Sequence, residues 1–149
     1  MYKIEKADLN KNDIEQLCRL SEIWASEDIS WGIVANTIDD IKQPVFVARD
    51  ENIIVGYCFG SFYTMERKLS GIEKKSKCFS VDELYVLPQY RNKGIGKKLL
   101  DSLIEEIKQR ADYITLTTST KDYKKVLGFY CDKNQMDFHD AFLFKKIEK

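Results

Sequence analysis

The feature that most constrains the fold is a strand, a short glycine-containing loop and a long amphipathic helix, in that order. Residues 79–86 (FSVDELYV) predict the strand. From Gly94 to Arg110, apolar side chains recur every four residues, which predicts a helix with one buried face. A second strand is predicted at 113–118 (YITLTT). A strand, a helix and a strand in this order form a crossover, so this part of the chain predicts two parallel strands in one sheet.

The other elements follow from hydrophobic periodicity and turn residues. Strands are predicted at 2–6 and 141–147, a hairpin at 44–50 and 53–63, and helices near 30–41, over 121–133, and after a cap at Asn12 or Asp13. The predicted order is therefore β-α-α-β-β-β-α-β-α-β. This order indicates a mixed α/β sheet with helices packed against it. A chain of 149 residues fits one domain, predicted to span residues 1–149.

Composition excludes several classes of protein. Lys plus Arg and Asp plus Glu both number 24, and this zero balance argues against nucleic acid or an anionic membrane as the main partner. The apolar runs are far shorter than the ~20 residues of a membrane span, and no secretory signal is visible. Cys18, Cys58, Cys78 and Cys131 are widely spaced, which favours reduced thiols in a cytoplasmic protein, and the single His139 argues against a metal site.

The loop before the long helix carries the chemical signal. Gly94 and Gly96 stand at the predicted helix start, where backbone amides are unpaired and open to an anion. Arg91, Lys93 and Lys97 add positive charge. The segment matches neither the Walker loop, which needs GxxxxGK[ST], nor the dinucleotide fingerprint, which needs a third glycine. We interpret it as a pyrophosphate cradle. A tight turn that only packs helix on strand is the alternative.

The string RNKGIGKKLL, preceded by ELYVLPQY, resembles the acyl-CoA-binding segment of the GNAT superfamily of N-acetyltransferases. Arg91, Gly94 and Gly96 match the family pattern Arg/Gln-x-x-Gly-x-Gly/Ala, and residues 84–88 match Leu-x-Val-x-Pro before it. The resemblance implies a GNAT-like acyl-CoA N-acyltransferase fold with acetyl-CoA as acetyl donor. It implies that amides of residues 92–97 hold the pyrophosphate and that the backbone of 84–86 pairs with the pantetheine arm. The implied cofactor-binding residues are Leu84, Tyr85, Val86, Arg91, Asn92, Lys93, Gly94, Ile95, Gly96, Lys97 and Tyr123.

Acetyl transfer to an amine needs a base, because a lysine-like amine has a pKa of about 10.4. Glu83 is the predicted base: in a regular strand it shares a face with Phe79, Val81 and Tyr85, and an apolar surrounding raises a carboxyl pKa. The resemblance also implies a glutamate base at this strand position. Asp82 is the fallback, because a bulge would break the alternation. An exposed edge-strand glutamate is the alternative interpretation.

The resemblance implies a tyrosine acid in the later helix, in a pattern like Ala-x-x-Phe-Tyr-x-x-x-Gly-Phe. In one register Tyr130 is this tyrosine and Gln135-Met136 replaces Gly-Phe; in the other, Tyr123 falls one residue early. The first leaves a helix of about a dozen residues, close to the mean helix length, so we choose Tyr130. Core packing of either tyrosine is the alternative.

The predicted reaction is direct acetyl transfer to a primary amine, with a small cationic acceptor such as an aminoglycoside or polyamine. Glu27, Asp28 and Trp31 are candidates for holding that amine, with core packing and solvated acids as their alternatives. Two other functions stay open: acetylation of a protein N-terminus or lysine, and a CoA-binding sensor without catalysis. The resemblance also implies a possible homodimer.

Overall fold

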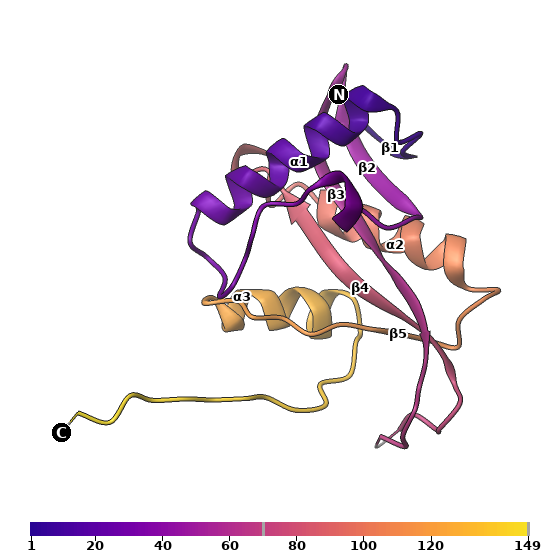
Figure 1. The fold of residues 1–149 in the computed structure, drawn as a ribbon, viewed down its shortest axis with the longest axis vertical. Helices are drawn as coiled ribbons and strands as arrows, with labels where there is room; N and C mark the ends of the chain where they lie inside the picture. Colours follow the sequence, from indigo (N-terminus) through magenta and orange to yellow (C-terminus); the bar gives the residue numbers. More distant parts are fainter. Residues whose placement is uncertain (70, 149) are drawn as a thin grey trace.

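The computed structural model describes residues 1–69 and 71–148, which contain one mixed five-stranded sheet (Figure 1). Its strands are β1 (Tyr2–Lys6), β2 (Val45–Asp50), β3 (Ile53–Thr64), β4 (Lys77–Val86) and β5 (Tyr113–Thr115), in the spatial order β1-β2-β3-β4-β5. The first four strands are antiparallel neighbours, and β5 runs parallel to β4 after the crossover helix. The predicted mixed α/β class and the crossover are therefore confirmed.

Helices cover both faces of this sheet. They are α1 (Lys11–Ser26), α2 (Ile95–Ile107) and α3 (Tyr123–Leu127), and α3 continues as one π-helical segment over Gly128–Lys133. Short 3-10 turns span Ile38–Asp40 and Pro88–Tyr90. In the described residues no helix has the length and apolar character needed to cross a bilayer.

Two apolar cores lie on opposite faces of the sheet. On one face α2 buries Ile95, Leu99 and Leu103 against β3 and β4, as the four-residue spacing predicts. On the other face α1 buries Leu17 and Leu20 against Tyr57, Tyr85 and their neighbours. Each strand side chain therefore points either toward α2 or toward α1. Side chains of β4 can act together at one site only where they point to the same face.

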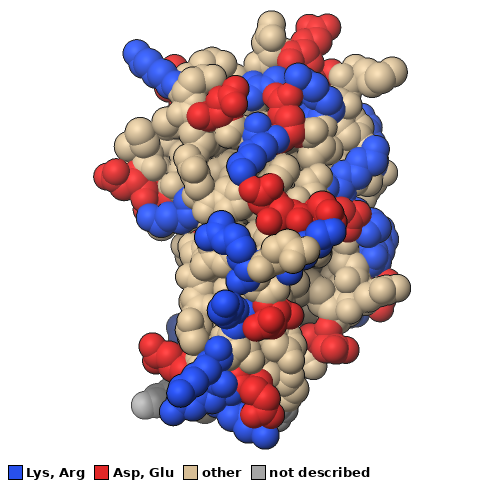
Figure 2. Space-filling model, turned by 90° about the vertical axis from the view of Figure 1, so that its right-hand side faces the viewer, with Lys and Arg blue, Asp and Glu red and all other residues tan. Residues whose placement is uncertain are grey.

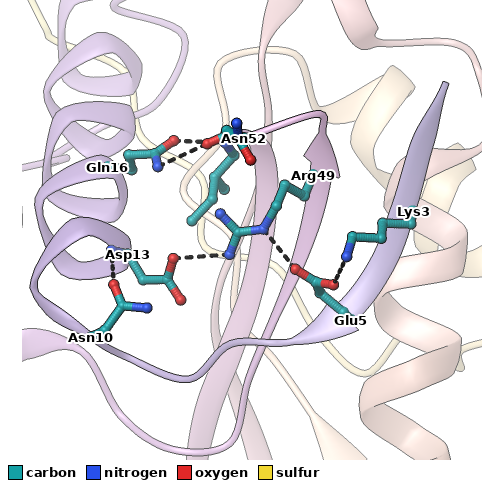
Figure 3. A network of polar contacts seen from close by, with 8 residues as sticks. Lys3, Glu5, Asn10, Asp13, Gln16, Arg49 and Asn52 are labelled. Atoms are coloured by element: carbon teal, nitrogen blue, oxygen red, sulfur yellow. Dashed lines mark hydrogen bonds and ion pairs between the residues drawn. The ribbon is translucent and has the colours of Figure 1, made fainter.

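A polar network ties α1 to the sheet at the end of the molecule that holds the N-terminus (Figure 3). The Arg49 guanidinium donates from Nη2 to Asp13 Oδ1 at 2.9 Å and from Nε to Glu5 Oε1 at 2.6 Å. Asn10, not Asn12 or Asp13, caps α1, because the Asn10 side chain accepts the Asp13 N–H while the buried Asp13 carboxylate is engaged by Arg49. The predicted cap was therefore wrong by two or three residues.

The predicted element order is wrong at two places. No helix spans residues 30–41; only the 3-10 turn at Ile38–Asp40 forms there. The side chains of Trp31, Val34 and Ile38, which suggested a buried face, are exposed, and Gly32 has a φ of +70°. This loop is held by strand-like contacts instead, because the Trp31 N–H donates to Ser119 O at 2.8 Å.

The second correction concerns the C-terminal segment. Residues 141–147 were predicted as a last strand, but they form no strand and run away from the sheet (Figure 1). Their apolar side chains have no core to enter: Phe142 is 92% and Leu143 86% exposed. Alternation alone predicted a strand here, yet a strand also needs a neighbouring strand to bond with.

The strands β4 and β5 diverge soon after they meet. Pairing is confined to Cys78–Ser80 of β4 and Tyr113–Thr115 of β5, so β5 is shorter than the predicted 113–118. Beyond this point the chain turns to the loop after α1, where Thr120 bridges to Ser30. Among residues 1–69 and 71–148, the stretch of β4 from Asp82 to Val86 therefore has β3 on one side and no strand on the other.

Charged side chains of both signs are interspersed over the face shown in Figure 2. This is the surface expected of a chain with 24 acidic and 24 basic residues in which neither sign is gathered in one part of the sequence.

Candidate active site

The loop before α2 forms a row of unused backbone donors. Gly94 caps the helix with φ +76° and no side-chain capping bond, and Asn92 is also left-handed at φ +61°. In the described part of the chain, none of the backbone amides of residues 92–97 donates to a protein acceptor. A Cβ added at Gly94 would meet nothing within 4 Å, so the space beside Gly94 is open. Donors of this kind at a helix start suit a phosphate group.

At Gly96 a glycine is needed for packing and not for a positive φ. A Cβ there would touch the Phe129 ring at 3.4 Å, so Gly96 lets the π-helical segment pack against the first turn of α2. This contact brings the segment that carries Tyr130 close to the cradle, although the two are more than thirty residues apart in the sequence.

The predicted cations of the loop have protein partners. Lys97 pairs with Asp101 at 3.0 Å, one turn further along α2, and Lys93 Nζ lies 5.2 Å from the centroid of the Tyr90 ring. Arg91 donates to Val86 O at 2.8 Å and to Glu27 Oε1 at 2.8 Å. The structure therefore connects Arg91 to α1 and β4 as well as to the loop that it begins.

The open edge of β4 presents backbone groups beside the cradle. Leu87 donates its N–H to Val55 O at 2.9 Å, and Val86 lies opposite Gly56 in the register. Because the bonding direction alternates along an antiparallel strand, the backbone groups of Leu84 and Val86 point away from β3. Arg91 reaches the Val86 carbonyl from that side. The outward groups of Leu84 and the Val86 N–H have the orientation that pairing with an extended ligand chain requires, and the pairing of residues 84–86 with the pantetheine arm stays a prediction.

Glu83 lies beside a bulge that changes its neighbours. Phe59 pairs with Glu83 and Gly60 with Val81, so Asp82 is an extra residue in β4. The predicted face was thus partly wrong: Glu83 shares the α1 face with Tyr85, whereas Phe79 and Val81 enter the core under α2. The bulge turns Asp82 outward, where it accepts a hydrogen bond from Ser61 at 2.6 Å.

The Glu83 carboxylate is held by neutral donors. Asn36 Nδ2 donates to Glu83 Oε2 at 2.8 Å, and Tyr57 Oη donates to the same oxygen at 2.6 Å. Burial raises the pKa of Glu83 above its ordinary 4.5, while these two hydrogen bonds lower it and the negative charges of Asp82 and Asp40 raise it further. A carboxylate in this setting is suited to accept a proton.

Sequence reasoning missed Asn36 and Tyr57. Tyr57 follows from the strand register. Phe59 pairs with Glu83, and Tyr57, two residues earlier in β3, lies on the same face of the sheet as Phe59. Asn36 had no comparable signal. It lies in a loop, where its N–H donates to Ser21 Oγ at 2.7 Å, and no periodic pattern specifies that contact.

The structure places the two candidate acids differently. Tyr130 packs against the core under α2, and burial raises its pKa. In the described residues its hydroxyl makes no hydrogen bond. Tyr123 begins α3 and is 60% exposed. Glu83 and Tyr130 therefore face opposite sides of the sheet, and Glu83 lies three residues beyond Ser80, the last β4 residue that pairs with β5.

Of the candidate acceptor residues, Asp28 and Trp31 meet at Lys121, whereas Glu27 is engaged by Arg91 and Tyr85. Glu27 accepts hydrogen bonds from both Arg91 and Tyr85. Asp28 is exposed and pairs with Lys121 at 2.6 Å. The Lys121 ammonium also lies 4.5 Å from the centroid of the Trp31 ring. No group of three or more metal-ligating side chains is present in the described residues.

These features fit acetyl-CoA in two respects. In the residues that the structure describes, the amides around the open space at Gly94 have no protein acceptor, which suits the pyrophosphate, and the edge of β4 beyond Ser80 has no strand partner, which suits the amide-containing arm.

Comparison with known proteins places this geometry in a family. The sequence model of the Acetyltransferase (GNAT) family matches residues 12–133, which is most of the chain. No curated protein matches the sequence.

Solved structures share the fold at low sequence identity. An aminoglycoside acetyltransferase from an uncultured soil metagenomic sample, in complex with sisomicin, is 19% identical with a TM-score of 0.69, over 99% of this chain and 97% of that one. A predicted acetyltransferase with acetyl-CoA from Clostridium acetobutylicum is 22% identical with a TM-score of 0.67, over 98% and 96%. A ribosomal-protein-alanine N-acetyltransferase from Brucella melitensis biovar Abortus 2308 is 18% identical with a TM-score of 0.65, over 99% of each chain.

The family match, the mixed sheet that opens between β4 and β5, and the amides before α2 agree with one another. The chain belongs to the GNAT family of N-acetyltransferases and is an enzyme that uses acetyl-CoA as its acetyl donor.

Proposed function

We propose that the enzyme acetylates a primary amine of a small cationic acceptor by direct transfer, with Glu83 as the base. The observation that carries this proposal is the Glu83 carboxylate, which accepts hydrogen bonds from Asn36 and Tyr57 and has no cationic partner in the described residues. It lies on the strand whose open edge leads to the cradle. An amine that arrives as an ammonium ion must lose a proton before it attacks, and Glu83 is placed to take it.

In this proposal the two parts of the donor site have separate tasks. The amides of residues 92–97 bind the pyrophosphate, and the outward backbone groups of Leu84 and Val86 orient the arm. Acetyl-CoA supplies the acetyl group as a thioester. In the described residues β4 has no strand partner on this side beyond Ser80, and the arm is proposed to pair with that edge.

Tyr130 is the proposed proton donor. A tyrosine hydroxyl is protonated at neutral pH, which a donor requires, and the burial that raises the pKa of Tyr130 makes it a weaker acid until a thiolate forms beside it. It packs on the side of the sheet opposite to Glu83, and the proposal assigns the two proton transfers to these two sides. Tyr123 is exposed at the start of α3 and is kept as the alternative.

The charge near Glu83 supports a cationic acceptor. Asp40 and Asp82 both lie close enough to raise the Glu83 pKa, so the local potential is negative. The solved relative with sisomicin is an aminoglycoside acetyltransferase, which supports the same class. A protein N-terminus is the second candidate, favoured by the exposed Trp31, Val34 and Ile38 on either side of Asn36 and by the fold shared with the ribosomal-protein-alanine enzyme.

An acceptor panel tests the proposal. Thiol release from acetyl-CoA is measured with polyamines, aminoglycosides, free amino acids and peptides with free N-termini. We expect release with the polycationic small molecules. Release with peptides alone would select the second candidate, and release with neutral or acidic acceptors alone would contradict both.

The cradle has its own test, which needs no turnover. Gly94→Ala is expected to weaken acetyl-CoA binding about tenfold, because a Cβ enters the open space before the amides and a φ of +76° is strained for alanine. Gly71→Ala is the matched control, since Gly71 also has a positive φ (+86°) with open space around it, in the β3–β4 connection. Equal acetyl-CoA affinity in both variants would contradict the proposed pyrophosphate cradle.

Light scattering of the same samples tests the predicted homodimer.

A further inference from the structure

Glu27 sits where three parts of the molecule meet. It is the C-cap of α1, and its N–H donates to Ile23 O and Trp24 O, which fixes its position at the helix end. Its Oε1 accepts from Arg91 Nη2 at 2.8 Å and from the Tyr85 hydroxyl. Only 16% of the Glu27 side chain and 25% of the Arg91 side chain are exposed, so this ion pair is largely shielded from water.

Arg91 connects Glu27 to the proposed acetyl-CoA site. Its Nε donates to Val86 O at 2.8 Å, which ties the end of β4 to the residue before the cradle. The next residue, Asn92, turns into the left-handed region, so the direction of the cradle depends on how Arg91 is held. The guanidinium also lies 5.4 Å from the Tyr85 ring centroid, and that ring stacks on Trp24 of α1 at 5.2 Å.

The loop after Glu27 leads to the base. Residues 28–37 bond to Ser119 through Trp31 and to Glu83 through Asn36. Glu27 therefore stands between the loop that orients the proposed base and the loop that presents the amides.

We infer that Glu27 is a positioning residue for acetyl-CoA binding, acting through Arg91, and is not an acceptor-binding residue. Its carboxylate is already paired with the Arg91 guanidinium and its side chain is only 16% exposed, so it is poorly placed to bind an amine from solution. Loss of this carboxylate frees the guanidinium from α1 and lets the start of the cradle move. The inference rests on the proposed cradle, and acetyl-CoA binding tests it without any acceptor.

The experiment compares Glu27→Gln with Glu15→Gln, which removes the same charge at an exposed site on the same helix, where Glu15 faces Lys11. Calorimetry gives the Kd for acetyl-CoA, and initial rates give the KM for each substrate. We expect Glu27→Gln to raise the acetyl-CoA Kd and KM about tenfold, the order expected for one charged hydrogen bond, and to leave the acceptor KM within about twofold. Glu15→Gln is expected to change none of these values.

A double-mutant cycle with Arg91→Lys separates positioning from general loss of stability. Lysine lacks the planar fork that reaches both Val86 O and Glu27, so Arg91→Lys alone weakens acetyl-CoA binding. If Glu27 acts through Arg91, adding Glu27→Gln to this variant weakens binding no further. Fully multiplicative effects of the two substitutions would overturn the inference.

Two further outcomes are decisive. A raised acceptor KM with an unchanged acetyl-CoA Kd would overturn the inference and restore Glu27 to the acceptor site. A wild-type protein that binds acetyl-CoA but acetylates no amine would contradict the proposed function while leaving the Kd comparison intact. If Glu27→Gln does not fold, Glu27→Asp, which keeps the charge but shortens the side chain, is expected to raise the acetyl-CoA Kd in the same way.

Discussion

Two carboxylate sites on the α1 face of the sheet are held in opposite ways. At the first, Arg49 stands between Asp13 and Glu5, and both carboxylates face its guanidinium (Figure 3). At the second, Glu83 receives hydrogen bonds from an amide and a phenol, which carry no charge. The pKa of Glu5 is lowered by Lys3 and Arg49, whereas burial raises the pKa of Glu83.

The difference separates a structural carboxylate from a chemical one. A carboxylate facing a guanidinium keeps its charge and holds two elements together. A carboxylate with neutral donors and a raised pKa exchanges its proton more readily near neutral pH, which a base must do. The comparison predicts that substitutions at the first site change stability and that substitutions at the second change turnover.

The largest expected effect is that of Glu83→Gln on turnover. Glutamine keeps the size and can accept from Asn36 and Tyr57, but it cannot take a proton. We expect kcat to fall by about 10²–10³, within the usual range for a general base, with the acetyl-CoA Kd unchanged. Steady-state rates and calorimetry measure the two quantities. Asp82→Asn is the comparison variant, and a large loss in that variant in place of Glu83→Gln would make Asp82 the base.

The next effect is on stability. Arg49→Met leaves Asp13, which is 2% exposed, without its cation, and we expect a loss of about 3 kcal/mol in the free energy of unfolding. Urea unfolding measures this. Arg19→Met, an exposed position on α1, is the control and should stay within about 0.5 kcal/mol of the wild type. The folded Arg49→Met protein should keep its kcat, and a kcat loss as large as that of Glu83→Gln would break the comparison.

A smaller effect concerns the acid limb of the pH–rate profile. The Tyr57 hydroxyl bonds to the charged form of Glu83 and so lowers its pKa. Tyr57→Phe removes this bond, the pKa rises, and the acid limb of kcat/KM moves to higher pH. Tyr63→Phe is a matched control, since the Tyr63 hydroxyl contacts Thr115. A limb that stays in place, or moves to lower pH, would mean that Tyr57 does not tune this group.

The smallest effects are changes of stability with opposite sign. The lowered pKa of Glu5 means that its charge stabilises the fold at neutral pH, and this contribution is lost as the pH falls through that pKa, below 4.5. The raised pKa of Glu83 has the opposite sign, so its contribution is present at low pH and lost as the pH rises. At pH 7 we therefore expect Glu5→Gln to lower Tm and Glu83→Gln to raise it slightly, by calorimetry. A lower Tm for both variants would remove the distinction.

Local patterns predicted the central part of the fold well. The four-residue spacing of α2, the apolar runs of β3 and β4, and the glycines before α2 each reflect a local requirement for burial or backbone shape. The cradle and the open edge of β4 follow from these elements. Residues 30–41 and 141–147 were mispredicted because most of their apolar side chains stay outside the two cores: Ile41 packs on the α1 core, but Trp31 packs against Phe144 of the other segment, and both of these rings remain exposed. Periodicity does not show which apolar residues enter a core.

The candidate site was predicted in part for the same reason. Glu83 was found from its strand position, but the bulge at Asp82 exchanged its neighbours, and a one-residue insertion has no signal in an alternating pattern. The hydrogen bond from Asn36 to Glu83 joins residues 47 apart in the sequence, and the ion pair between Glu27 and Arg91 joins residues 64 apart. Contacts at such separations depend on the assembled sheet.

The central claim is that Glu83 is the base, and the most direct measurement is the pH dependence of kcat/KM for the wild type and Glu83→Gln with the best acceptor of the panel. The account predicts a wild-type acid limb with an apparent pKa above the ordinary 4.5 of glutamate, and no such limb in the residual activity of the variant. The same limb in both proteins, with similar rates, would contradict it.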